Sequence, residues 1–220
     1  MSRRTYQQYC GLAAALDVVG QRWTLLIVRD LAPGPRRFTD LFEGLPGIST
    51  DLLADRLRAL EAAGAVAKRE IRNPAPAKLY ELTDRGRELA RLAGELARWG
   101  GPLLPPIDEA GDHLVNARWP LQQRAARYRG GFPDADVHLV LDGEEELTLS
   151  LTGQRGRLRY GHSDTEPLLT IRATTPALLD LLRRPPSGDA GADDPGTVPD
   201  GIEVDGRRDL FGQLFRSLRN

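Results

Sequence analysis

The feature that most constrains the fold of this chain is a series of three helix-forming segments separated by short turns. The first is predicted over residues 22–31, where a wide apolar face indicates a helix at the centre of a core. A short helix over 37–43 follows a Pro-Gly-Pro turn, and Pro46-Gly47 separates it from the third helix. That third helix begins among three consecutive N-cap residue types and ends at Gly64. This order is typical of a helix-turn-helix.

Two strands and a further helix follow the third helix. Strands are predicted over 66–71 and 78–82, on either side of the turn-forming sequence Asn-Pro-Ala-Pro at 73–76. Thr83 is expected to cap a helix that continues to Trp99. The first part of the chain therefore predicts a winged helix-turn-helix, mainly α with a two-stranded wing. Such a fold sets its third helix into the major groove of DNA.

Charge is distributed unevenly along a chain of 220 residues whose formal net charge is −1. Residues 1–104 contain 16 Lys and Arg against 12 Asp and Glu, whereas residues 105–220 contain 14 against 19. A basic first half joined to an acidic second half is expected of a DNA-binding domain fused to another domain. We therefore expect a DNA-binding and dimerisation domain over 1–104 and a ligand-sensing domain over 105–220, joined near Pro102 to Pro106.

Several classes of protein are excluded by features that the sequence lacks. No stretch approaches the ~20 apolar residues of a membrane span, and the N-terminus has no apolar signal core, so we expect a cytoplasmic protein without a membrane partner. Cys10 is the only cysteine, which rules out an intrachain disulfide. His113, His138 and His162 show no metal-ligand spacing, and neither a Gly-rich phosphate loop nor a nucleophile elbow is present. We expect no metal, no cofactor and no enzyme activity.

The third helix carries the candidates for reading bases. Leu53, Leu57 and Leu60 share one face and are expected to be buried. An Arg on the opposite side can pair with guanine, and an Asp can accept a hydrogen bond from cytosine. As an alternative, Asp55 pairs with Arg58 on the helix surface, which makes Thr50 and Arg58 stronger candidates than either Asp. The residues expected to face DNA from this helix are Ser49, Thr50, Asp51, Asp55, Arg56 and Arg58.

Cations outside that helix are candidates for contacts with phosphate. Glu70 is the only acidic residue expected beside the cations of the wing. Each phosphate that they neutralise would steepen the salt dependence of binding by roughly one unit of log–log slope. A solvated face is the alternative for any one of them alone, whereas their clustering favours DNA. The candidates are Arg36, Arg37, Lys68, Arg69, Arg72 and Lys78.

Several blocks of the sequence resemble the HxlR-type winged helix-turn-helix regulators, which are relatives of the MarR group. The matching blocks lie at 16–27, 34–38, 45–49 and 80–83, in the same order, within residues 9–100. The resemblance implies a bacterial transcription regulator that binds a pseudo-palindromic site in double-stranded DNA. It also implies a homodimer, built from the N-terminal helix predicted over 10–19 and the helix after the wing.

Dimerisation follows from the residues as well. A first helix is predicted over 10–19, and its Leu12 and Leu16 form an apolar stripe. Leu92 and Leu96 form a second stripe on the helix after the wing. Both stripes need a partner surface.

Cys10 lies just before the first helix, where many HxlR-type regulators have a cysteine, so the resemblance implies a redox role. Gly11 follows it where the family often has Pro. A reactive thiolate needs a helix N-terminus or nearby cations, and both are compatible with this position. The alternative is a small buried residue at the dimer interface.

The second half of the chain predicts an α+β domain. Alternating apolar and polar residues between 137 and 172 indicate a half-buried antiparallel sheet of about four strands. The other predicted elements are a helix over 108–129 interrupted near Trp119-Pro120, a helix from Pro176 to Leu182 capped by Thr175, a mobile loop over 185–201, a strand over 202–204 and a helix over 209–218.

This order of elements, and the sequence at 202–206, resemble a sterol carrier protein type-two-like domain. The resemblance implies an apolar tunnel that admits a lipid-like or aromatic effector. Ordinary core packing is the alternative for each candidate lining residue. These residues are Leu178, Leu182, Leu210, Phe211, Leu214 and Phe215.

The sequence thus predicts a homodimeric, sequence-specific regulator of transcription that is controlled by an apolar small molecule. Repression is favoured because no segment indicates a contact with RNA polymerase. The alternative is a lipid-binding carrier module whose helical first half mediates only protein contacts. The cations around Arg36, Arg37 and the wing favour the regulator, because a protein-interaction domain has no need to concentrate them there.

Overall fold

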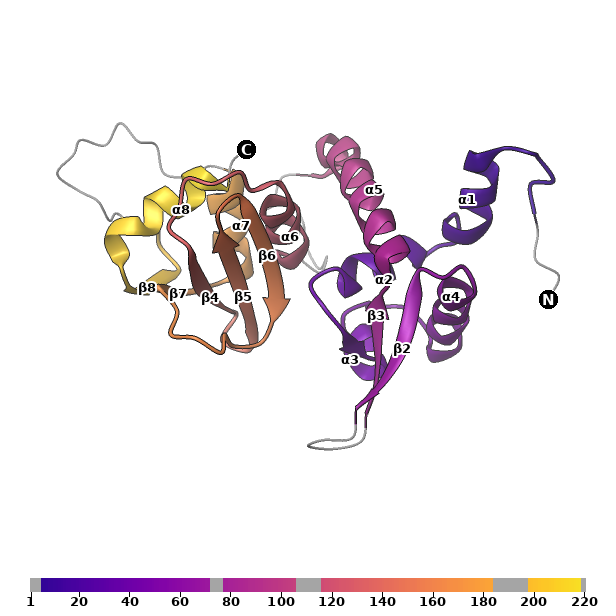
Figure 1. The fold of residues 1–220 in the computed structure, drawn as a ribbon, viewed down its shortest axis with the longest axis horizontal. Coiled ribbons are helices and arrows are strands. Elements are labelled where there is room, and N and C mark those ends of the chain that lie inside the picture. The colour runs from indigo at the N-terminus through magenta and orange to yellow at the C-terminus, as the bar shows by residue number, and fades with distance from the viewer. Residues whose placement is uncertain (1–4, 72–76, 106–115, 184–197, 219–220) are drawn as a thin grey trace. The chain divides into compact units, whose positions relative to one another are not determined.

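The computed structural model describes residues 5–71, 77–105, 116–183 and 198–218. The chain divides into two compact units, Met1–Leu104 and Pro105–Asn220 (Figure 1). Each unit has its own cluster of buried apolar side chains, so each is described separately.

The first unit is mainly helical, with a small antiparallel sheet in the order β1-β3-β2. The two-residue strand β1 is absent from the prediction, because two residues show no alternation that sequence could reveal. Its elements are α1 (Gly11–Val19), α2 (Thr24–Leu31), β1 (Arg36–Arg37), α3 (Phe38–Glu43), α4 (Thr50–Ala62), β2 (Val66–Ile71), β3 (Ala77–Leu82), α5 (Asp84–Gly100) and the 3-10 turn η1 (Gly101–Leu103).

Helix ends in this unit follow from local chemistry. Ser49 caps α4, since its side-chain oxygen accepts a hydrogen bond from the Leu52 N–H at 3.3 Å. Gly64 has a φ of +69°, a conformation that glycine adopts readily, and the chain turns there into β2. Trp23 has a φ of +79°, so α2 begins at Thr24 and not at the predicted Arg22.

The core of the first unit lies between α2, α3, α4 and the sheet. Leu53, Leu57 and Leu60 are at most 1% exposed, which confirms the predicted inner face of α4. Ile27 and Leu31 of α2 belong to the same cluster of buried side chains. The helix-turn-helix is thereby fixed against its own core.

The second unit contains a five-stranded mixed sheet in the order β6-β5-β4-β7-β8. β4 and β7 are parallel, and the remaining neighbours are antiparallel. Its elements are α6 (Arg118–Arg127), β4 (Ala135–Leu141), β5 (Glu145–Thr152), β6 (Arg155–Tyr160), β7 (Leu169–Ala173), α7 (Thr175–Arg183), β8 (Ile202–Gly206), the 3-10 turn η3 (Arg208–Leu210) and α8 (Phe211–Ser217).

The mixed sheet corrects the predicted antiparallel sheet of about four strands. Alternation of apolar residues identifies a strand and its buried face, but it carries no information about direction or neighbours. The connection after β6 crosses over, so that β7 pairs with β4 and Ile171 lies opposite Leu139. β8 then extends the sheet at the edge formed by β7.

Two helix starts in this unit also differ from the prediction. Pro120 is the third residue of α6, where the first turn leaves backbone N–H groups unpaired, so it does not break the helix. The N-terminal part of the predicted 108–129 helix lies largely outside the described residues. Thr175 is inside α7, and Thr174 Oγ1 accepts the hydrogen bond from the Ala177 N–H at 3.4 Å. The Thr175 hydroxyl donates instead to the Asp142 carboxylate at 2.5 Å.

Leucine, isoleucine and phenylalanine side chains from the sheet and from α6, α7 and α8 form the core of the second unit. The predicted loop over 185–201 lies largely outside the described residues. Within the described ranges, no single helix is long and apolar enough to cross a membrane. α1 and α2 meet the length and composition criteria only as a pair, and they are bent by 80°.

Candidate nucleic-acid interface

α4 presents a polar face on the side opposite its buried leucines. The hydroxyls lie in its first turn, where unpaired N–H groups and the helix dipole create a partial positive charge. The exposed residues on this face are Ser49, Thr50, Asp51, Asp55 and Arg58. This face can therefore offer hydrogen-bond donors and acceptors to the base edges of a major groove.

Asp55 and Arg58 form an ion pair on that face. The side chains are 55% and 69% exposed, so solvent screens their attraction and a competing partner can replace it. The alternative pairing considered from the sequence is thus present in the structure. Arg58 can still turn toward a base or a phosphate, and Asp55 can still turn toward a base.

Arg56 lies on the flank of α4 and contacts the chain before α2. Its Nε donates to the Arg22 carbonyl oxygen at 3.3 Å, and its Nη2 donates to the Gln21 side-chain oxygen at 3.4 Å. These contacts fix the start of α2 against α4. We place Arg56 among the groups that position the helix, and not on the face that carries Arg58.

The two arginines of β1 differ in their surroundings. Arg36 is half-buried, with its Nη2 donating to the Asp40 carbonyl oxygen at 3.1 Å and its Nε 3.8 Å from the Asp40 carboxylate. Arg37 is exposed, and its backbone N–H donates to the Asp40 carboxylate at 3.0 Å. Arg37 is therefore the arginine whose side chain reaches solvent from this turn.

Each described cation of the wing faces a carboxylate. Lys68 Nζ lies 3.0 Å from Glu61, Arg69 Nε lies 3.6 Å from Glu81, and Lys78 Nζ lies 3.9 Å from Glu70. From the sequence, Glu70 was the only carboxylate expected near these cations. Glu61 approaches from α4, and Glu81 is brought close by the register of β2 and β3. Arg72 lies outside the described residues.

These pairs are unequal in strength. Lys68 also lies over the Tyr80 ring, 5.4 Å from its centroid, and its hydrogen bond to Glu61 raises the pKa of its ammonium group. Lys78 and Glu70 are 71% and 70% exposed, so their attraction is largely screened. Among the wing cations that the structure describes, Lys78 is consequently the one that can be transferred most easily to a phosphate.

Apolar side chains are exposed along α1, α5 and the turn that follows α5. Leu92 and Leu96 are 66% and 52% exposed, and Leu12 on α1 is 69% exposed. Ala13 is the one buried residue of α1. Further exposed apolar residues are Tyr6, Tyr9, Leu16, Trp99, Leu103 and Leu104. Leu103 and Leu104 were missed because they fall in the sequence assigned to a linker.

Cys10 is a free, exposed thiol at the N-cap of α1. Hydrogen bonds from the backbone at Ala13 and Leu12 lower the pKa of its thiol. The start of a helix therefore favours its thiolate.

The six candidate ligand-lining residues of the second unit come together in one core. Leu178, Leu182, Phe211, Leu214 and Phe215 are at most 3% exposed, and Leu210 packs against the same cluster. Their side chains contact one another and the sheet, as core residues do.

Known proteins match the first unit. The sequence profile of the HxlR-like helix-turn-helix family matches residues 18–108. The transcriptional regulator YvaP of Bacillus subtilis is 38% identical over 93 residues, which are 42% of this chain and 85% of YvaP. The regulator YodB of the same organism is 34% identical over 98 residues, 44% of this chain and 87% of YodB. The solved structure of reduced YodB has a TM-score of 0.39 at 31% identity, covering 48% of this chain and all of that one.

Proposed function

Because the chain belongs to the HxlR-like helix-turn-helix family of transcriptional regulators, we propose that it is a homodimeric repressor that recognises a specific DNA sequence through α4. The family is one of regulators and not of enzymes. The observation that carries the proposal is the exposed polar face of α4, fixed from behind by Leu53 and Leu57. Thr50 and Arg58 are the side chains proposed to contact bases.

The proposed phosphate contacts surround this face. Arg37 approaches from β1, and Arg69 and Lys78 from the wing; all three are exposed. Lys68 and Arg36 are proposed to belong to the same surface, and each forms an ion pair with a carboxylate of the first unit. Contacts of this kind set the register and orientation of the protein on the duplex, while base contacts supply the specificity.

Exposed apolar residues support the proposed homodimer. α1 has nine residues and buries only Ala13, and isolated helices of this length are marginal in water. Leu12 and Leu16 on α1, with Leu92 and Leu96 on α5, would be removed from water by a second copy. Two copies would present two recognition helices to two half-sites, which requires a pseudo-palindromic operator.

The second unit is the proposed site of control by an apolar small molecule. The resemblance of its sequence to a sterol carrier protein type-two-like domain motivates this, and the apolar core shared by α7, α8 and the sheet supports it. An effector would enter that core among Leu178, Leu182 and Phe215. It can change the affinity for DNA only by binding one spacing of the two recognition helices more tightly than another.

Oxidation of Cys10 is a second proposed means of controlling the protein. Its thiol is exposed and its pKa is lowered at the N-terminus of α1, the helix assigned to the dimer interface. A peroxide would oxidise two Cys10 thiols to an intersubunit disulfide, and a small-molecule disulfide would form a mixed disulfide with release of one thiol; either product would place a new covalent constraint beside that interface.

The proposal is tested by titrating the purified chain of 220 residues with the DNA that flanks its own gene, over a range of salt concentrations and with random DNA as competitor. We expect a specific complex with a steep salt dependence. Lys78→Ala should reduce the log–log salt slope by about one unit and weaken binding to all sequences alike. Arg207→Ala, which removes an exposed cation from the second unit, is the matched control. Equal affinity for flanking and random DNA would contradict the proposal.

A further inference from the structure

The sheet of the second unit has a polar face, on the side opposite its core. Val137 and Leu139 of β4 point into the core, whereas Asp136 and His138 lie on the other side. The connection from β6 to β7 reaches the Asp136 carboxylate: Ser163 donates a hydrogen bond to it, and Thr165 Oγ1 donates to it at 3.2 Å. The connection is thereby held against the polar face.

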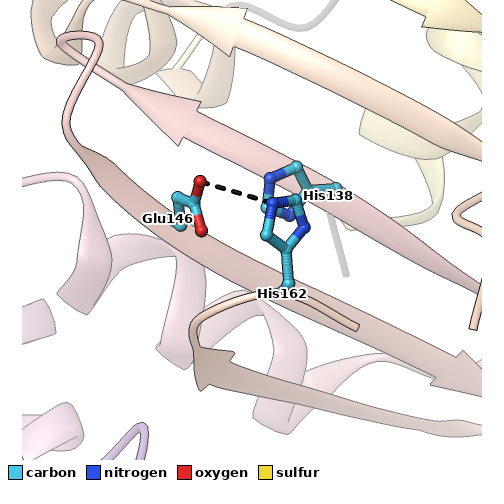
Figure 2. Close-up of side chains that lie close together, drawn as sticks. All are labelled: His138, Glu146 and His162. Carbon is cyan, nitrogen blue, oxygen red and sulfur yellow. Dashed lines mark ion pairs between the residues drawn. The ribbon is translucent and has the colours of Figure 1, made fainter. Parts of the chain in front are cut away.

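Two histidines and a glutamate meet where this connection begins (Figure 2). The rings of His138 and His162 stack with their centroids 3.9 Å apart and their planes 13° apart. His162 Nε2 lies 3.4 Å from Glu146 Oε1. One ligand-type atom from each of the three residues lies within 4.8 Å of the others.

We propose that His138, Glu146 and His162 form a binding site for a divalent transition-metal ion of the Zn²⁺ class. Two imidazole nitrogens and one carboxylate oxygen are a ligand set that suits Zn²⁺, Co²⁺ or Ni²⁺. Three protein ligands leave a coordination position open for water or for a small anionic ligand. The site joins β4, β5 and the connection after β6, which are distant in sequence.

The burial of His138 indicates a ligand. His138 is 3% exposed, and its Nδ1 is a buried atom without a hydrogen-bond partner among the described residues. Buried polar atoms normally have a partner, and a metal ion bound through this nitrogen would supply one.

The spacing of the ligand atoms suits a metal ion. Ligands about 2.05 Å from a tetrahedral Zn²⁺ are separated from one another by roughly 3.3 Å. The 3.4 Å between His162 and Glu146 matches this value. Imidazole binds a metal in the plane of its ring, so His162 has to turn out of its stack on His138 for both rings to bind one ion. His162 is 66% exposed and Glu146 is 43% exposed, so both can rotate toward an ion whose third ligand, His138, is fixed by its burial.

Sequence reasoning missed this site because its ligands have no motif spacing. His138 lies on β4, opposite Thr148 of β5, and Glu146 is two residues from Thr148 along the same strand. His162 is brought back over the sheet by the turn at Gly161, whose carbonyl oxygen accepts a hydrogen bond from the Thr148 hydroxyl at 2.7 Å. The period-two alternation could have placed His138 and Glu146 on one face. Nothing in it locates His162.

The test is calorimetric titration of Zn²⁺ into the full chain, without a histidine tag, after treatment with chelator. A Cys10→Ser background removes the exposed thiol as a competing ligand. We expect one ion per chain, with affinity reduced at least tenfold by His162→Ala and by Glu146→Gln. Glu144→Gln, an exposed carboxylate on the same hairpin but outside the cluster, should bind as the background protein does.

Co²⁺ provides an independent readout of the ligands, because a four-coordinate Co²⁺ site has visible d–d absorption. We expect this absorption in the background protein and in Glu144→Gln, and its loss in His162→Ala. Absence of Zn²⁺ binding, or unchanged affinity in both ligand variants, would overturn the proposal. No DNA is present in either measurement, so the outcome is independent of the proposed repressor function.

Discussion

Arg58 and Asp55 have opposite relations to DNA although they neutralise each other in the free protein. The arginine can donate two hydrogen bonds to guanine, whereas the aspartate repels every phosphate near it. Both side chains are more than half exposed, so the attraction between them contributes little to stability. In the free protein, Asp55 therefore balances the positive charge of the Arg58 guanidinium on the exposed face of α4.

Asp55→Asn should therefore bind DNA more tightly. The substitution keeps the shape of the side chain and removes one negative charge, so affinity for operator and random DNA should rise by up to about tenfold. The free energy of unfolding should change by less than about 1 kcal/mol. Fluorescence anisotropy at fixed salt and urea denaturation provide the two measurements. Weaker binding to the operator alone would instead assign Asp55 a direct contact with cytosine.

Cys10 should react as a thiol of lowered pKa. Because hydrogen bonds from the backbone favour the thiolate, alkylation by iodoacetamide should accelerate at a lower pH than it does for the urea-unfolded chain. The rate as a function of pH is followed by mass spectrometry of the intact protein. Coincident pH profiles for the folded and unfolded chains would show that the start of α1 does not activate this thiol.

At the scale of elements, the sequence was informative wherever one helix or strand carries its own pattern. The leucines of α4 recur at helical spacing, and Thr83 caps α5 as predicted. Ser49, one of three candidate N-cap residues, is the one that caps α4. β1 was missed, because a two-residue strand exists only through its pairing with β3. The cap of α7 was displaced by one residue, because the distant Asp142 accepts the Thr175 hydroxyl.

The contact between α5 and the turn that precedes β2 depends on Gly86. A Cβ added there would lie 2.0 Å from the Ala65 carbonyl oxygen, which is backbone and cannot move aside cheaply. Alanine is favoured over glycine in a helix by about 1 kcal/mol, but overpacking of this kind costs about 1–3 kcal/mol. We therefore expect Gly86→Ala to destabilise the first unit, as measured by its thermal midpoint.

Gly100→Ala on the same helix is the control for this prediction. Nothing lies within 4 Å of a Cβ at Gly100, so the variant should be as stable as the wild-type chain or slightly more stable. An unchanged midpoint for Gly86→Ala would show that α5 can shift away from Ala65 without cost.

At the scale of the whole molecule, the proposed homodimer depends on apolar side chains that one chain leaves in water. Combining Leu92→Glu with Leu96→Glu should yield a monomer in sedimentation velocity, because burying two carboxylates at an interface is costly. Both leucines are more than half exposed within one chain, so the fold of the monomer should persist. Phe42→Glu, an exposed apolar residue on α3, should leave the dimer intact. A wild-type chain that sediments as a monomer would contradict the proposed assembly.

The contacts between segments that are distant in sequence could not be predicted from the sequence. Alternation identified the strands of the second unit but not the crossover that pairs β7 with β4. Charge identified the cations of the wing, yet their partners Glu61 and Glu81 depend on how α4, β2 and β3 pack. The site formed by His138, Glu146 and His162 has the same origin, since only the folded sheet brings these residues together.

The most direct test of the central claim is the ratio of affinities for operator and random DNA in the wild-type chain and in Arg58→Ala, measured at one salt concentration. If Arg58 reads a base, this ratio should fall roughly five- to 150-fold, which corresponds to a loss of about 1–3 kcal/mol in the free energy of discrimination. The affinity for random DNA should change little. Arg207→Ala should leave the ratio unchanged. An undiminished ratio in Arg58→Ala would contradict the assignment of the exposed face of α4 as the surface that reads DNA.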